Sequence, residues 1–173
     1  MKQIFGIMIV AGALSAGSAS AQSADQPFAR EAAMGGMAEV ELGTLAKEKA
    51  SNADVKQFGD RMVTDHGKAN EELKQWAQQK KVTLPTAIGA KHRAIRDRLA
   101  KLSGDAFDKA YMRDMVSDHQ HDVAAFKREA ASGTDPELKA WAAKILPTLE
   151  DHLKMAQETA AKVGASHAPA KKK

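Results

Sequence analysis

The sequence predicts an all-α protein in which four long helices form a bundle. Aromatic residues make up only 5% of the chain, whereas Ala, Lys, Glu and Met, which favour helices, are abundant. Apolar residues recur at spacings of three and four along four separate segments, as on the buried faces of bundle helices. Capping residues and breaks separate the segments, so we expect two tight turns and one long connection.

The amino-terminal residues are expected to lie outside this fold. Lys2 precedes an apolar run over residues 4–16, and residues 19–21 read Ala-Ser-Ala, the small-x-small pattern of a cleavage site. We therefore predict a signal peptide over residues 1–21 and a periplasmic or secreted protein. The run is too short for a membrane span of about 20 residues, and no later segment is suited to one.

The net charge of +4 comes from the two ends of the chain. Without Lys2 and the three lysines at residues 171–173, 22 basic residues face 22 acidic ones. The domain expected over residues 22–164 is therefore neutral and gives no sign of binding nucleic acid. Residues 165–173 are predicted to be a disordered basic tail, able to make a peripheral contact with the envelope. The absence of cysteine excludes disulfides and thiolate ligands.

The first two helices are expected to form a hairpin. The first covers about residues 27–50, and its apolar stripe has Glu41 on its edge and Glu39 further round. Residues 51–54, Ser-Asn-Ala-Asp, form a capping signal, after which a second helix reaches about Lys80. His66 falls on the apolar stripe of this second helix.

A second hairpin is expected after a connector over residues 81–103. The connector is predicted to hold a short helix at about residues 87–102 and to run back along the bundle. Long helices follow at about residues 105–131 and 136–163, with His119 and His152 on their apolar stripes, and Pro147 is expected to kink the last one. This order gives a ferritin-like connectivity; the alternative is an up-down bundle with a decorated loop.

Three histidines preceded by aspartate are the candidate functional residues. Met62-Val63-Thr64-Asp65-His66 returns as Met115-Val116-Ser117-Asp118-His119, and Asp151-His152 follows. A buried imidazole is costly unless something binds it. Counted from the two turns, Glu41 matches His119 and His66 matches His152, so one residue from each long helix is expected at a common depth.

Such a set suits a transition metal ion such as iron, zinc or copper. The predicted ligands are Glu41, His66, His119 and His152. The residues expected to support them are Asp65, Asp118, Asp151, Glu39 and Tyr111. Methionines offer a second possibility, a soft copper(I) site formed from Met34, Met37, Met62, Met112, Met115 and Met155.

The alternative is a metal-free structural role. A histidine on a bundle stripe can pair with an aspartate of the next helix, and three such pairs would form a buried polar network. Methionines on a stripe usually fill the core. The protein would then be a non-enzymatic envelope protein that binds a partner through its surface or tail.

Catalysis is not indicated by the sequence. A di-iron centre of the usual kind needs Glu-x-x-His on two helices, but Val63, Val116 and Leu149 stand three residues before the histidines. The sequence also lacks a phosphate-binding glycine loop and a nucleophile elbow. No catalytic residue is assigned, and sequestration or stress protection is the expected role.

Five segments resemble a known bacterial family. They are residues 38–43 (Ala-Glu-Val-Glu-Leu-Gly), 61–66, 107–111 (Phe-Asp-Lys-Ala-Tyr), 115–119 and 146–153. The resemblance is to a domain-of-unknown-function family of exported proteins, often labelled outer-membrane proteins, and covers about residues 28–163. It implies a ferritin-like four-helix bundle in which metal binding is expected, and it implies no particular reaction.

Overall fold

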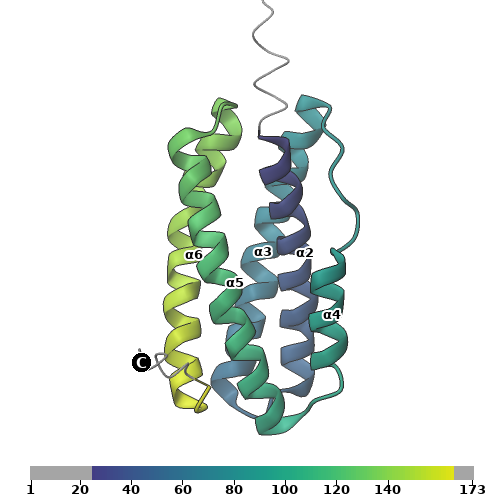
Figure 1. The fold of residues 1–173 in the computed structure, drawn as a ribbon, viewed down its shortest axis with the longest axis vertical. Helices are drawn as coiled ribbons and strands as arrows, with labels where there is room; N and C mark the ends of the chain where they lie inside the picture. Colours follow the sequence, from purple (N-terminus) through teal and green to yellow (C-terminus); the bar gives the residue numbers. More distant parts are fainter. Residues whose placement is uncertain (1–24, 166–173) are drawn as a thin grey trace, which may run out of the picture.

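The predicted four-helix bundle is confirmed by a computed structural model, which describes residues 25–165 (Figure 1). The first hairpin consists of α2 (Gln26–Lys49) and α3 (Ala53–Lys80). The short α4 (Ala90–Leu99) lies in the connection, and the second hairpin consists of α5 (Gly104–Ser132) and α6 (Pro136–Lys162). Because the connection returns along the bundle, α5 starts at the same end as α3, as the ferritin-like order requires.

The helix boundaries follow from local capping. The Asn52 side chain accepts hydrogen bonds from the backbone N–H groups of Asp54 and Val55 and starts α3. Asp135 caps the first turn of α6 in the same way, and α6 continues through Pro147. The short α4 starts later than expected because Gly89 precedes it in an extended conformation.

Two buried aspartates join the hairpins at opposite ends of the bundle. Asp108 of α5 accepts hydrogen bonds from the backbone N–H groups of Ser51 and Asn52, at 3.2 and 2.9 Å. At the other end, Asp25 accepts a hydrogen bond from the backbone N–H of Thr134, at 2.8 Å. These bonds set the position of one hairpin against the other.

The first hairpin is packed closely enough to require glycine. A Cβ added to Gly43 of α2 would lie 2.5 Å from the carbonyl oxygen of Gly59 in α3, and one added to Gly59 would lie 2.8 Å from that of Gly43. The two backbones are therefore in direct contact. Gly67, further along α3, has nothing within 4 Å of an added Cβ.

The apolar core is divided into two ends by a polar layer. One end contains Phe58, Met62, Phe107 and Met115. The other end contains Leu73 and Trp76 in one cluster and Val123, Phe126 and Leu149 in another. Between these ends lie four buried side chains, one from each long helix, which we call the polar layer: Glu39, His66, His119 and His152.

The ends of the chain extend beyond the described residues. The signal peptide predicted for residues 1–21 and residues 166–173 of the predicted tail lie outside them. Ala165 is buried in the core, so the bundle includes this residue, which we had assigned to the tail. Within residues 25–165, none of the helices is long and apolar enough to cross a bilayer.

Candidate metal centre

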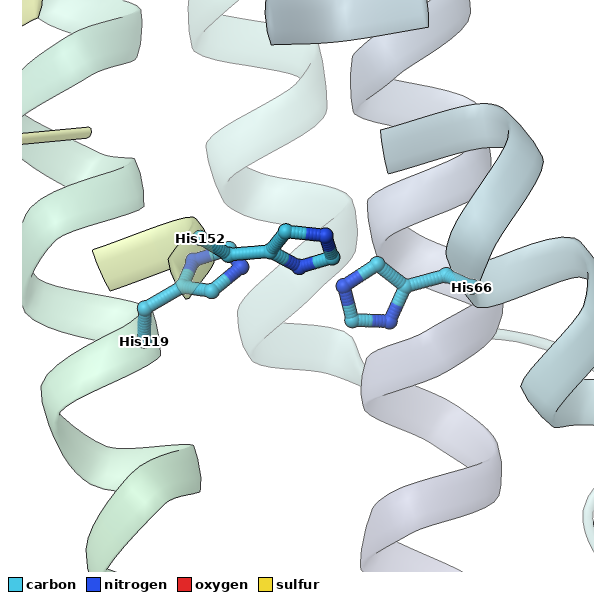
Figure 2. A group of neighbouring side chains, drawn as sticks. All are labelled: His66, His119 and His152. Carbon is cyan, nitrogen blue, oxygen red and sulfur yellow. The ribbon is translucent and has the colours of Figure 1, made fainter. Parts of the chain in front are cut away.

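Three imidazoles meet in the polar layer. His66 of α3, His119 of α5 and His152 of α6 turn toward one another between the helices (Figure 2). Their ring centroids are 5.4–5.7 Å apart, and one ring nitrogen of each lies within 4.8 Å of the others. We call these residues the histidine triad. Their positions match the common depth that the sequence predicts.

Hydrogen bonds orient two of the three rings. Nδ1 of His119 lies 3.0 Å from the carbonyl oxygen of Met115, and Nε2 of His152 lies 2.8 Å from a carboxylate oxygen of Asp65. Because a carbonyl and a carboxylate only accept, each of these nitrogens carries the proton and donates it. The remaining nitrogens, Nε2 of His119 and Nδ1 of His152, are therefore left with free lone pairs.

Within residues 25–165, each ring of the triad has one buried nitrogen without a hydrogen-bond partner. Nε2 of His119, Nδ1 of His152 and Nε2 of His66 are all buried without a hydrogen-bond partner among the described residues. If His66 carries its proton on Nε2, it can donate to only one of the other two lone pairs. At least one buried acceptor then remains unsatisfied, at a cost of about 1–3 kcal/mol.

Burial keeps the imidazoles neutral, which is the form that binds metals. Burial lowers the pKa of His119 to about 4, helped by the nearby His152. Burial and the two neighbouring rings hold the pKa of His66 well below its usual value. The pKa of His152 is lowered by burial, although the hydrogen bond to Asp65 opposes this shift.

The carboxylate from α2 is Glu39, so the prediction of Glu41 as a ligand is wrong. Glu41 is exposed on the side of α2 that faces α4, where it accepts a hydrogen bond from Arg96 at 3.0 Å. Glu39 is fully buried, and its Oε1 lies 4.0 Å from Nδ1 of His119. Glu39 thus stands beside the ring nitrogen that bonds to Met115.

Glu39 belongs to an acidic group between α2 and α5. Burial raises its pKa well above the usual value, and the charge of the nearby Asp118 raises it further. Both carboxyl oxygens of Glu39 are buried without a hydrogen-bond partner among the described residues. Burial, followed by the charge of Asp118, raises the pKa of Asp122 to about 7. Burial and the neighbouring carboxyl groups therefore favour the protonated form of Glu39.

The three predicted aspartates have different surroundings. Asp65 bonds to a triad ring, but the ring belongs to His152 of α6 rather than to the adjacent His66. Asp118 lines a surface pocket with Asp122 and faces Glu39. Asp151 is exposed.

Tyr111 is buried near the acidic group. Its ring stacks on that of Phe107, with the ring centroids 5.5 Å apart, and forms a T-shaped pair with Phe58, with the centroids 6.1 Å apart. Its hydroxyl has no hydrogen-bond partner within the part of the chain that the structure describes. Burial raises the pKa of Tyr111 well above its usual value, so the hydroxyl stays protonated.

The methionines are not gathered around one point. Met62, Met112 and Met115 are buried in the apolar core, whereas Met34 and Met37 line two separate surface pockets. Most of them fill space in the core or at its edge. Met34 and Met37 therefore lie apart from the core cluster that contains Met62, Met112 and Met115, so the six methionines of the copper(I) alternative do not all line one place in the described structure.

A sequence signal for Glu39 exists in the flanking glycines. Gly36 and Gly43 lie three residues before and four residues after it, on the same face of α2. A Cβ added to either glycine would clash with α3, so this face is covered by a neighbouring helix. A stripe defined only by large apolar residues misses such a face.

The comparisons with known proteins address the fold and the family. The family model described as a domain of unknown function, DUF4142, matches residues 11–159. The chain belongs to this family. None of the curated proteins matches the chain in sequence.

Solved structures resemble this DUF4142 chain along most of its length. A DUF305 protein from Streptomyces coelicolor, described as secreted, has a TM-score of 0.71 at 17% identity. It covers 84% of this chain and 97% of its own. CopM, solved in a Cu(II)-bound form, has a TM-score of 0.67 at 21% identity and covers 80% of this chain and 96% of its own. Both similarities show a shared helical fold.

Proposed function

We propose that this protein is an exported metal-binding bundle that holds one transition metal ion on the histidine triad. The observation that carries the proposal is the set of three buried ring nitrogens without partners, one each from His66, His119 and His152. A metal ion binds all three lone pairs at once, whereas hydrogen bonding among the rings leaves at least one unsatisfied. The role is sequestration or protection from metal stress rather than catalysis.

The distances fit such an ion after a small adjustment of the rings. Imidazole nitrogens bind zinc at about 2.0–2.1 Å, which places three ligand nitrogens roughly 3.3–3.5 Å apart. The triad nitrogens lie within 4.8 Å of one another, so small side-chain rotations bring them to a common ion. The hydrogen bond from His152 to Asp65 matches the carboxylate–histidine–metal arrangement of known sites.

Imidazole ligands suit copper, zinc and iron alike. The Cu(II)-bound form of CopM, a protein of similar fold, makes copper the first ion to test. Export is supported by the leader predicted for residues 1–21 and by the similarity to a DUF305 protein described as secreted. In this proposal Glu39, rather than Glu41, is the residue that α2 places beside His119.

Titration of the metal-free protein, produced without a histidine tag, tests the proposal. We expect saturable binding of one Cu²⁺ or Zn²⁺ ion per chain by isothermal titration calorimetry. His121→Ala is the matched control, because His121 lies on α5 two residues from His119 but is exposed. Wild-type protein that binds neither Cu²⁺ nor Zn²⁺, with iron also absent from the purified protein, would favour the metal-free network.

A further inference from the structure

A surface pocket between α3 and α6 reaches the histidine triad. The pocket has a volume of about 150 Å³ and is lined by His66 and His152, two of the three triad residues. Asp65, which bonds to His152, also lines it. The pocket therefore ends at two of the three buried rings of the triad.

The pocket on the opposite side of the polar layer is not lined by the imidazoles. The pocket between α2 and α5 is lined by Asp118 and Asp122 and by none of the three triad histidines. Glu39 is fully buried next to His119 on this side. A cation entering from here would have to pass the buried side chain of Glu39.

One ion pair joins the two walls of the α3–α6 pocket. Lys144 of α6 donates a hydrogen bond to Glu72 of α3 at 2.8 Å, and both residues line the pocket. The Lys144 side chain is 62% exposed and that of Glu72 only 24%, and Lys68 also lines the pocket. A cation that enters this pocket therefore passes both charges of the pair as well as the carboxylate of Asp65.

We propose that metal ions reach the triad through this pocket and that the Glu72–Lys144 pair controls the rate of entry. Lys144 repels a cation, and its ion pair with Glu72 neutralises the carboxylate of Glu72. Without Lys144, the charge of Glu72 would attract the cation toward Asp65 and the rings. The inference rests on the proposed metal binding by the triad. It adds a route and a rate-controlling residue pair that the site itself does not require.

The test is the rate at which the metal-free protein takes up Cu²⁺, followed by quenching of tryptophan fluorescence in a stopped-flow instrument. Lys144→Gln should speed association and Glu72→Gln should slow it, each by roughly twofold to tenfold at low salt, since charge steers association. Added salt should reduce both differences. Opposite signs are decisive, because a purely structural pair would give the same direction for both variants.

A second ion pair supplies the matched control. Lys127 of α5 and Glu150 of α6 form an ion pair with an N–O distance of 2.7 Å, and neither residue lines this pocket. Their glutamine variants should leave the rate of metal uptake unchanged. Unchanged rates for Lys144→Gln and Glu72→Gln, or changes of the same sign, would overturn the entry route while leaving metal binding intact. Slower uptake by Asp122→Asn alone would assign entry to the α2–α5 side instead. Absence of binding by the wild type would overturn both proposals.

Discussion

The two sides of the polar layer differ in how they hold charge. On the α3–α6 side, Asp65 is ionised: burial opposes this, but hydrogen bonds from His152 and Arg61 outweigh it and lower the pKa. On the α2–α5 side, burial and then the charge of Asp118 raise the pKa of Glu39 instead. The α3–α6 side therefore presents a charged carboxylate, Asp65, that can polarise a metal ligand. On the α2–α5 side, the protonated form of the Glu39 carboxyl group is favoured.

The comparison shows why the same residue types serve different purposes in one layer. A carboxylate bonded to a ring N–H makes the opposite nitrogen a better metal ligand. A protonated carboxyl group beside a ring adds no such effect and keeps further charge out of the core. Variants on the two sides should therefore differ in metal affinity and in their response to pH.

Loss of any triad ring should have the largest effect. His66→Ala, His119→Ala or His152→Ala should weaken binding of Cu²⁺ or Zn²⁺ by more than about 100-fold, beyond the usual cost of losing an outer hydrogen-bond partner. Equilibrium titration against a chelator of known affinity measures the change. Retention of wild-type affinity by any of the three variants would remove that ring from the site.

Loss of the ionised carboxylate on the α3–α6 side should have the next largest effect. Asp65→Asn should weaken metal binding by about 10–100-fold, because the ring of His152 loses its charged partner. Asp118→Asn is the matched variant on the other side and should change the affinity much less, because Asp118 faces Glu39 rather than a triad ring. Equal losses for the two variants would show that the sides do not differ.

The tight packing of α2 on α3 should appear in stability rather than in affinity. Gly43→Ala should lower the free energy of unfolding by about 1–3 kcal/mol, because the added methyl group meets the backbone of Gly59. Gly67 has open space around an added Cβ, so Gly67→Ala should raise the free energy of unfolding by about 0.5–1 kcal/mol. Urea denaturation followed by circular dichroism checks both, and equal effects would contradict the close approach.

The proton on Glu39 should produce the smallest effect, visible as a dependence on pH. The pKa of Glu39 is higher in the folded state than in the unfolded chain, where it is 4.5. The contribution of Glu39 to the free energy of unfolding is therefore fully present below pH 4.5 and is lost as the pH rises through the pKa of the folded state. Glu39→Gln keeps the shape and the donor without a titrating proton. The stability of this variant relative to the wild type should therefore increase from pH 5 to pH 8.

Urea midpoints at several pH values measure this difference. A constant difference between Glu39→Gln and wild type across the range would mean that Glu39 titrates as an ordinary carboxyl group.

The helices and the depth of the triad could be predicted from the sequence because both depend on local signals. Asn52 of the predicted capping signal caps α3 in the structure, and apolar spacing places His66, His119 and His152 on inward faces. Helical rise alone then sets the depth of each ring, given the positions of the turns.

Partners across helices could not be predicted in this way. His152 bonds to Asp65 of another helix, because the adjacent Asp151 projects about 100° away around α6. Glu39 rather than Glu41 enters the layer, because α4 covers the other flank of α2 and draws Glu41 to Arg96. The rotation of each helix depends on its neighbours, which one sequence does not specify.

X-ray absorption spectroscopy of the untagged protein loaded with one equivalent of Cu²⁺ or Zn²⁺ tests the central claim most directly. The account predicts three imidazole ligands at about 2.0 Å, with the multiple-scattering pattern of histidine. In His152→Ala this number should fall, whereas in His121→Ala it should stay at three. A wild-type spectrum with oxygen ligands alone, or one unchanged by His152→Ala, would contradict the account.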